Sequence, residues 1–197
     1  MASDERIEKL RSVLENRQTD LKIILENIHD PHNVNAIYRS CEAVGVMDVI
    51  LLYIKEEFPE IKFNSSGSAC KWIDLYKFSN PHDIIPKLKN DGHQIYSLVL
   101  DKNAKTIYDI DWNKPSVIIV GNEHSGVSKE SQKLSTEKLY IPMEGVVESL
   151  NVSVATAVTL YEASRQRKLS GKYPNDNINQ KWLEDKLNKW VLNRSES

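Results

Sequence analysis

Three short polar segments contain the residues best suited to chemistry, and each is expected to follow a buried strand: 26-ENIHDPHNVNAIYR-39, 121-GNEHSGVS-128 and 142-PMEGVVESLN-151. Their candidate side chains are Asn33, Asn35, Arg39, Glu123, Ser149 and Asn151. Arginine is a fixed cation with a planar fork of donors that suits phosphate, so a site lined by Arg39 would bind an anion. In parallel α/β sheets, ligands bind beyond the carboxyl ends of the strands, which is where these segments should lie.

Each of these residues also has a purely structural interpretation. Asn33 stands where a helix cap is expected. Asn35 and Arg39 are four residues apart on a helix face that should point away from the core, with Glu42 as an ion-pair partner for Arg39. Ser149 would cap the long helix that follows it, and Asn151 would lie in its first turn. Spacing alone leaves both interpretations open.

Several familiar sites are excluded by missing residues. The first strand–helix turn lacks GxGxxG, which argues against a dinucleotide site, and no GxSxG is present for a serine hydrolase. Gly121 and Gly126 have the spacing of a phosphate-binding loop, but Val127 stands where that motif requires lysine. Cys41 and Cys70 are the two cysteines. They form no metal-ligand cluster, so we expect two reduced, buried thiols and no bound metal.

Composition and charge set broader limits. The 197 residues carry a formal net charge of -2, which argues against a protein that wraps nucleic acid over its whole surface. Basic residues gather near the start of the C-terminal segment: Arg165, Arg167, Lys168 and Lys172. This cluster would either meet phosphates or complement the end of a solvated helix. No run of about 18 apolar residues or signal-peptide pattern is present, so we expect a cytoplasmic protein without a membrane segment.

The hydrophobic pattern predicts alternating strands and helices. Strands are expected at 21–26, 49–54, 72–78, 95–100, 116–120 and 138–143. Helices are expected around Ile7, Leu10 and Leu14, at 33–44, 81–92, 129–134 and 150–169, and around Leu183, Leu187, Trp190 and Val191. The stretch 64-NSSGSA-69 should be a loop or a short helix start. Alternation with continuous apolar strands predicts an α/β fold, a mostly parallel sheet covered by helices on both faces.

Three longer stretches together resemble a known family. LENIHDPHNVNAIYRSCEAVGV, IIVGNEHSGVS and IPMEGVVESLNVSVATAVTLYEASRQR are similar, in order and separation, to the three motifs of the SPOUT superfamily in its branch of RNA ribose 2′-O-methyltransferases. The resemblance spans residues 25–167. The terminal segments resemble the extensions of the enzymes that methylate the D-loop guanosine of tRNA. The implied organisation is an N-terminal helical extension (1–19), a knotted methyltransferase domain (20–170) and a C-terminal helical extension (171–197).

The resemblance implies a deep trefoil knot in the C-terminal part of the sheet and S-adenosylmethionine as cofactor. It places the following residues in contact with the cofactor or beside it: Leu98, Leu100, Gly121, Asn122, Ile141, Met143 and Leu150. It places Arg39 at the reacting centre, where it would orient the ribose phosphate and stabilise developing oxyanion charge. Asn33 would help to hold Arg39, Glu123 would fix the loop or the arginine, and Ser149 and Asn151 match the serine and asparagine of the third motif.

The implied reaction is methylation of a tRNA ribose 2′-oxygen, at the D-loop guanosine at tRNA position 18. Alternatives are another tRNA ribose such as the wobble position, a ribosomal RNA ribose, or a catalytically silent knotted RNA-binding protein. A homodimer is implied, with the active site at the interface and arginine and cofactor supplied by different chains. The basic residues expected to contact RNA are Arg11, Arg165, Arg167, Lys168 and Lys172.

Overall fold

The protein is described by a computed structural model that covers residues 3–54, 58 and 69–192. Its centre is a seven-stranded sheet with the order β3-β2-β1-β6-β4-β7-β5, in which every pair of neighbours is parallel. The strands are β1 (Leu21–Glu26), β2 (Asp48–Leu52), β3 (Asp74–Phe78), β4 (Gln94–Leu98), β5 (Lys105–Thr106), β6 (Ser116–Gly121) and β7 (Glu137–Tyr140). The helices are α1 (Asp4–Glu15), α2 (Pro31–Ala43), α3 (Pro81–Asn90), α4 (Lys129–Leu134), α5 (Val152–Leu169) and α6 (Gln180–Leu192), with short 3-10 helices at Ala69–Trp72 and Ile107–Asp109.

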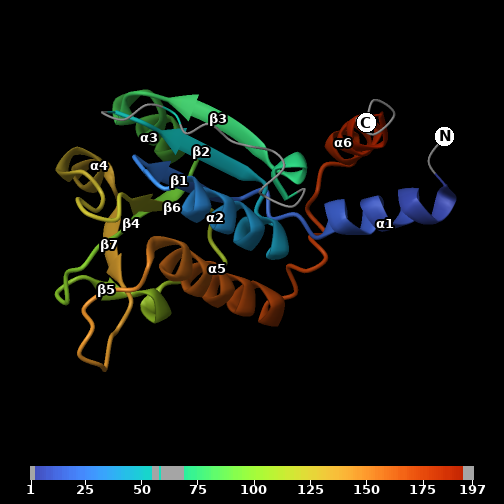
Figure 1. The fold of residues 1–197 in the computed structure, drawn as a ribbon. Helices are drawn as coiled ribbons and strands as arrows, with labels where there is room; N and C mark the ends of the chain where they lie inside the picture. Colours follow the sequence, from blue (N-terminus) through green and yellow to red (C-terminus); the bar gives the residue numbers. More distant parts are fainter. Residues whose placement is uncertain (1–2, 55–57, 59–68, 193–197) are drawn as a thin grey trace.

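Helices cover both faces of the sheet, as the continuous apolar strands predict (Figure 1). One face packs against α2 and α5 in a core that includes Ile37 and Leu160. The other face packs against α3 and α4, with Ile85 and Leu88 buried and Leu134 packed against them. The predicted α/β class is confirmed. No helix in the described part of the chain is long and apolar enough to cross a membrane.

The two terminal helices lie side by side at one end of the molecule (Figure 1). They share a third apolar cluster that contains Leu14 of α1, Leu187 and Trp190 of α6, and Met47 from the domain. The rings of Trp72 and Trp190 meet edge to face with centroids 4.9 Å apart. The N- and C-terminal segments therefore form one helical unit that packs on the domain.

Three local expectations were wrong. Helix α2 begins at Pro31, and the cap is Asp30, whose carboxylate accepts from His32 N–H; Asn33 is inside the helix. The cap of α5 is Asn151 and not Ser149. Asn35 is buried rather than turned away from the core. The two cap errors have the same cause, because several polar residues near a helix start can cap it and the pattern does not select among them. The burial of Asn35 depends instead on the packing of α2, which the pattern does not show.

Two short elements were not expected, the strand β5 and the 3-10 helix Ile107–Asp109. The two-residue strand β5 was not predicted, because a strand so short leaves no alternating pattern. Residues 64–68 of the stretch NSSGSA lie outside the described residues, and Ala69 begins a 3-10 helix.

The largest correction concerns Arg167, which was expected to contact RNA. Its side chain is completely buried. Nε donates to Trp112 O at 2.8 Å, Nη1 donates to Gln18 Oε1 at 3.0 Å and to the Asp20 carboxylate, and Nη2 donates to Lys114 O at 3.2 Å. Formal charge in a sequence does not reveal burial. Arg167 therefore joins α5 to the residues before β1 and β6 and is not available to phosphates.

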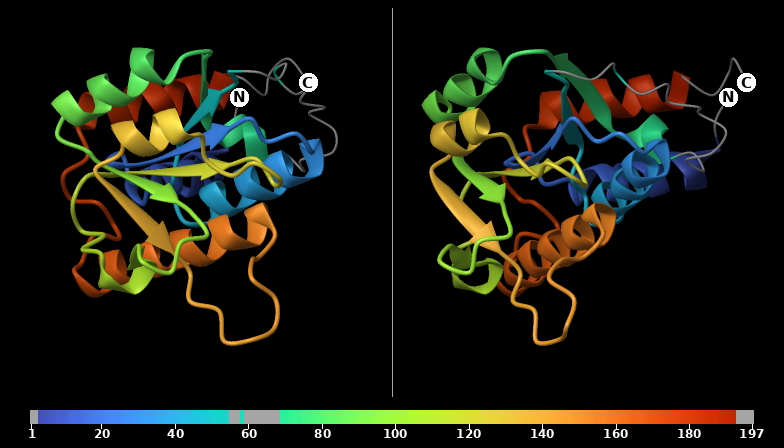
Figure 2. Two further views of the ribbon diagram at one scale, coloured as in Figure 1. Left: turned by 90° about the vertical axis from the view of Figure 1, so that its left-hand side faces the viewer. Right: turned by 60° about the vertical axis from the view of Figure 1, so that its left-hand side comes forward.

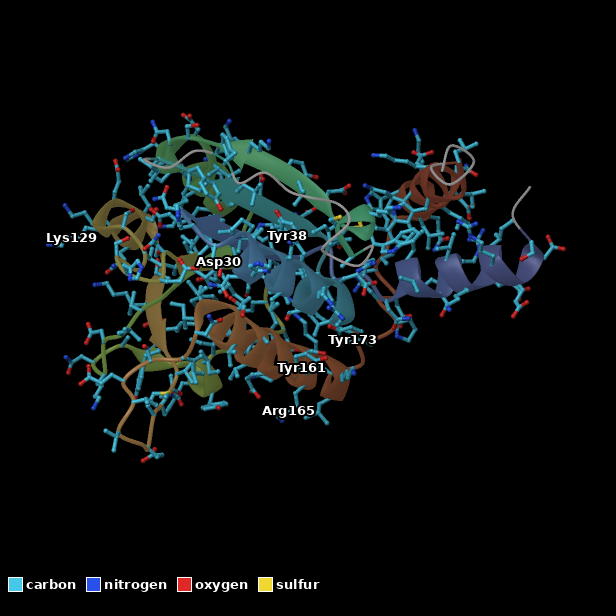
Figure 3. All side chains as sticks on the ribbon, in the orientation of Figure 1. Asp30, Tyr38, Lys129, Tyr161, Arg165 and Tyr173 are labelled. Carbon is cyan, nitrogen blue, oxygen red and sulfur yellow. The ribbon has the colours of Figure 1, made fainter. Side chains whose placement is uncertain are left out.

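Lys172 is tied into the same network. Its ammonium group donates to Asp20 Oδ2 at 3.0 Å and to Asn113 O at 2.6 Å. By contrast, Arg165 is exposed beside Tyr161 along α5, and it pairs with Glu162 of the same helix (Figure 3). The basic cluster of the sequence is thus two sets, one internal and one on the surface.

Replacing Arg167 with methionine should lower the free energy of unfolding by about 2–4 kcal/mol. The change keeps most of the volume but removes the Arg167 donor from two carbonyls and from Asp20, whose carboxylate keeps only Lys172. Urea denaturation would measure the loss. The matched control is Arg165→Met on the same helix, where the arginine is exposed, Glu162 keeps its Gln166 donor and a smaller change is expected. Equal losses in the two variants would contradict the structural role of Arg167.

Candidate active site

The turn after β6 is organised by the side chain of Asn122. Its Oδ1 accepts from His124 N–H at 2.8 Å and from Ser125 N–H at 3.1 Å, while its Nδ2 donates to Asn27 O at 2.8 Å. Asn27 directly follows β1, the neighbouring strand. One amide thus closes the turn on itself and ties it to the next strand.

The same turn requires glycine at two positions. A Cβ atom at Gly121 would lie 2.1 Å from the carbonyl carbon of Gly126, well inside van der Waals contact. Gly126 has φ of +65°, a conformation that glycine adopts without strain. The glycine spacing that resembled a phosphate-binding loop is explained by this close backbone approach.

A cavity of about 440 Å³ opens beside this turn, beyond the carboxyl ends of β4, β6 and β7. It is lined by residues from all three strand ends and from the loop 141–151, which projects from the body of the molecule (Figure 2). The lining includes every residue that was expected beside the cofactor: Leu98, Leu100, Gly121, Asn122, Ile141, Met143 and Leu150. Position at the carboxyl edge of a parallel sheet is the usual place for a ligand.

Three further candidates form a chain of hydrogen bonds at the cavity. Asn33 Nδ2 donates to Glu123 Oε1 at 2.7 Å, and Asn151 Nδ2 donates to Asn33 Oδ1 at 3.1 Å. Asn151 Oδ1 also accepts from Ser153 N–H at 2.8 Å, which caps α5. Glu123, Ser149 and Asn151 line the cavity. The chain joins α2, the turn after β6 and the start of α5, so the structural and functional interpretations of Asn151 are compatible.

Arg39 is not part of this assembly within one chain. It is exposed on α2 and lines a separate hollow of about 380 Å³ with His32, Asn35 and Ala36. The expected pairing of Arg39 with Glu42 is also wrong, because Glu42 lies within 3.4 Å of the buried Arg17 guanidinium. The structure therefore gathers the other candidates for the site and leaves the arginine on a neighbouring surface.

Sequence reasoning missed Glu26, which is fully buried at the end of β1 and lies opposite Gly121 in the register of the sheet. Its Oε2 accepts from Ser128 N–H at 3.3 Å, and Oε1 has no hydrogen-bond partner among the described residues. Burial raises the pKa of this carboxyl, partly offset by its contacts with Ser128. A single acidic residue that ends the apolar run LKIILE was the available clue. Glu26 thus contacts the segment after β6 through the backbone N–H of Ser128.

Comparison with known proteins places these features in context. Residues 20–161 match the SpoU rRNA Methylase family. A tRNA (guanosine(18)-2′-O)-methyltransferase of Aquifex aeolicus is 40% identical over 190 residues, which cover 95% of this chain and 89% of that protein. The crystal structure of an A. aeolicus TrmH/SpoU tRNA modifying enzyme superposes with a TM-score of 0.89 at 38% identity, covering 95% of both chains. An AdoMet-bound rRNA methyltransferase from Sinorhizobium meliloti superposes with a TM-score of 0.67 at 26% identity, covering 79% of this chain and 59% of that one.

The raised pKa of Glu26 predicts a pH-dependent contribution to stability. A carboxyl whose folded pKa lies above its unfolded value favours folding while it is protonated, and this contribution is lost as the pH rises through the folded pKa. The unfolding free energy of the wild type minus that of Glu26→Gln should therefore fall as the pH rises from about 4. Chemical denaturation across this range would measure it. A difference that is flat or increases with pH would contradict the prediction.

Proposed function

The chain belongs to the SpoU rRNA methylase family, and on that premise we propose that it methylates a ribose 2′-oxygen of tRNA with S-adenosylmethionine, at the D-loop guanosine at tRNA position 18. The observation that carries the proposal is the cavity lined by residues of the second and third motif segments, whose Glu123 and Asn151 are hydrogen-bonded to Asn33 of the first segment. The choice of tRNA rests on relatives named tRNA (guanosine(18)-2′-O)-methyltransferase, which match 95% and 96% of this chain.

The cavity suits the proposed cofactor in size and in lining. Its volume is within the range of sites for small organic ligands, and Leu98, Ile141 and Leu150 provide apolar walls. The close contact of Gly121 with Gly126 exposes backbone instead of side chain at the edge of β6. When bound, S-adenosylmethionine supplies an electrophilic methyl group on a sulfonium sulfur. The protein then has to hold the ribose oxygen in line with that methyl group.

The proposed role of Arg39 is to bind the ribose phosphate and to stabilise charge on the 2′-oxygen as its proton leaves. Arginine side chains remain protonated in proteins, so Arg39 acts as an electrostatic and orienting group while phosphate or water accepts the proton. Asn33 and Asn151, joined to Glu123, give the rim of the cavity a fixed polar edge against which the ribose is positioned. Ser149 adds a hydroxyl on the same rim.

We further propose a homodimer in which Arg39 of one copy faces the cavity of the other. Two observations support it. Arg39 lines a hollow separate from the cavity of its own chain. Helix α5, which packs beside α2, the helix of Arg39, exposes the large hydrophobic side chains Val154 (47%) and Tyr161 (57%). The resemblance to the SPOUT superfamily also supports a trefoil knot in the segment that contains β7, the loop 141–151 and α5.

Binding of tRNA is proposed for the exposed basic residues and the terminal helical unit, in a cytoplasmic enzyme. Arg165 and Lys168 lie on the exposed side of α5, and Arg11 projects from α1, where it pairs with Glu184 of α6 at 2.6 Å. Exposed pairs of this kind exchange readily for phosphate contacts. Residues 1–19 and 171–197 then act together as an RNA-binding extension of the domain 20–170.

Incubation of the protein with unmodified tRNA transcripts and radiolabelled S-adenosylmethionine should label one D-loop guanosine ribose. Arg39→Ala should abolish labelling while leaving cofactor affinity within about threefold, because the proposed contact of Arg39 is with the ribose phosphate and not with the cofactor. Mapping of the labelled nucleotide and calorimetry of cofactor binding are the measurements. Label at the wobble ribose or on ribosomal RNA would contradict the substrate, and equal loss of cofactor binding would contradict the role of Arg39.

Mixing two inactive variants should restore activity if arginine and cavity come from different copies. Leu150→Lys places a bulky cation in the cavity, and Arg39→Ala removes the arginine. Random pairing of equal amounts leaves about a quarter of the sites intact, in heterodimers with one complete site. Methyl transfer after mixing and re-equilibration is the measurement, with each variant alone as control. No recovery in a mixture that forms heterodimers would contradict a shared site.

A further inference from the structure

The charged residues that line the cavity are all acidic. Among its lining residues, Glu123 and Glu148 carry a formal charge at neutral pH, and none is lysine or arginine. The exposed cations proposed to meet RNA lie elsewhere, on α1, α2 and α5. A ligand that enters the cavity therefore meets negative charge.

The two carboxylates differ in how they are engaged. Glu123 is held by Asn33 at 2.7 Å. Glu148 makes no hydrogen bond or ion pair with the residues described at 3–54, 58 and 69–192, and it is exposed on the loop 141–151, directly before Ser149. Its charge is thus not neutralised by a neighbour in that part of the chain. Glu148 is the carboxylate free to respond to the charge of a ligand.

The walls of the cavity increase the effect of this charge. Val120 and Val127 are almost completely buried, and Leu98, Ile141 and Leu150 are partly buried around the opening. Apolar walls reduce the screening that water provides, so a charge pair a few ångströms apart at such an edge is stronger than the same pair in bulk solvent. A unit change in the charge of the ligand should therefore change its affinity.

The proposed cofactor and its product differ by such a unit. S-adenosylmethionine carries a sulfonium cation, and loss of its methyl group leaves the neutral thioether of S-adenosylhomocysteine, while the amino and carboxylate groups are common to both. Resting on the proposed function, we propose that Glu148 is a specificity-determining residue that makes the cavity prefer the cationic cofactor over the neutral product. Transfer of the methyl group then removes the positive charge on sulfur that Glu148 attracts. The loss of this attraction favours exchange of product for fresh cofactor.

The test is calorimetric binding of S-adenosylmethionine and S-adenosylhomocysteine to three full-length proteins: wild type, Glu148→Gln and Glu144→Gln. The matched control is Glu144, which is exposed on the same loop and does not line the cavity. Glu148→Gln should raise the Kd of S-adenosylmethionine by about three- to tenfold and leave that of S-adenosylhomocysteine within about twofold. Glu144→Gln should change neither Kd, and so leave the ratio of the two unaltered. Raising the salt concentration should weaken cofactor binding more than product binding in the wild type, and this difference should shrink in Glu148→Gln.

Other results would overturn the inference. An equal change in both affinities would assign Glu148 to a group that cofactor and product share, or to the shape of the loop. An unchanged ratio, or the same effect in Glu144→Gln, would remove its selective role. If the wild type bound neither compound at millimolar concentration, the proposed function would fail as a whole. Normal binding with an unaltered ratio would leave the methyltransferase proposal intact and reject the role of Glu148 alone.

Discussion

The contact between Gly121 and Gly126 is the constraint on which the cavity depends. The two backbones approach so closely that no side chain fits between them, and this approach is possible because Asn122 holds the turn closed and joins it to Asn27. The parallel register of β1 and β6 places Glu26 opposite Gly121, so the turn also has a buried carboxyl beneath it. The shape of the cavity therefore depends on the turn after β6, and the position of that turn depends on the pairing of β6 with β1.

Helix α5 connects this edge of the sheet with the opposite edge. It begins at the cap Asn151, which belongs to the polar chain beside the cavity, and its last turn contains the buried Arg167. Eighteen helical residues span about 27 Å, enough to cross the sheet. Arg167 fixes the far end through Gln18, Asp20 and two carbonyls. Because Gln18 belongs to this network, a cut after residue 19 would divide it, and the N-terminal extension is energetically continuous with the domain.

The sequence allowed much of the fold and part of the site to be predicted, for identifiable reasons. The main strands have continuous apolar runs, and their limits agree with the structure within about three residues. The residues that the family resemblance placed beside the cofactor line the cavity. The burial of Arg167, Asn35 and Glu26 was not predictable from pattern, since burial of a polar residue depends on partners distant in sequence. The caps Asp30 and Asn151 were not predictable for a similar reason, because only the geometry of the folded chain selects one polar residue among several.

Electrostatics explains why the arginine and the cavity occupy separate surfaces of one chain. A guanidinium inside the cavity would neutralise its carboxylates and would repel a cationic cofactor, whereas carboxylates beside Arg39 would repel an RNA phosphate. In the structure the acidic lining and the hollow at Arg39 are distinct. Two ligands of opposite charge can then bind without competing for the same local field. Methyl transfer requires the two surfaces to meet, and in the proposed homodimer a second copy would bring Arg39 to the rim of the cavity.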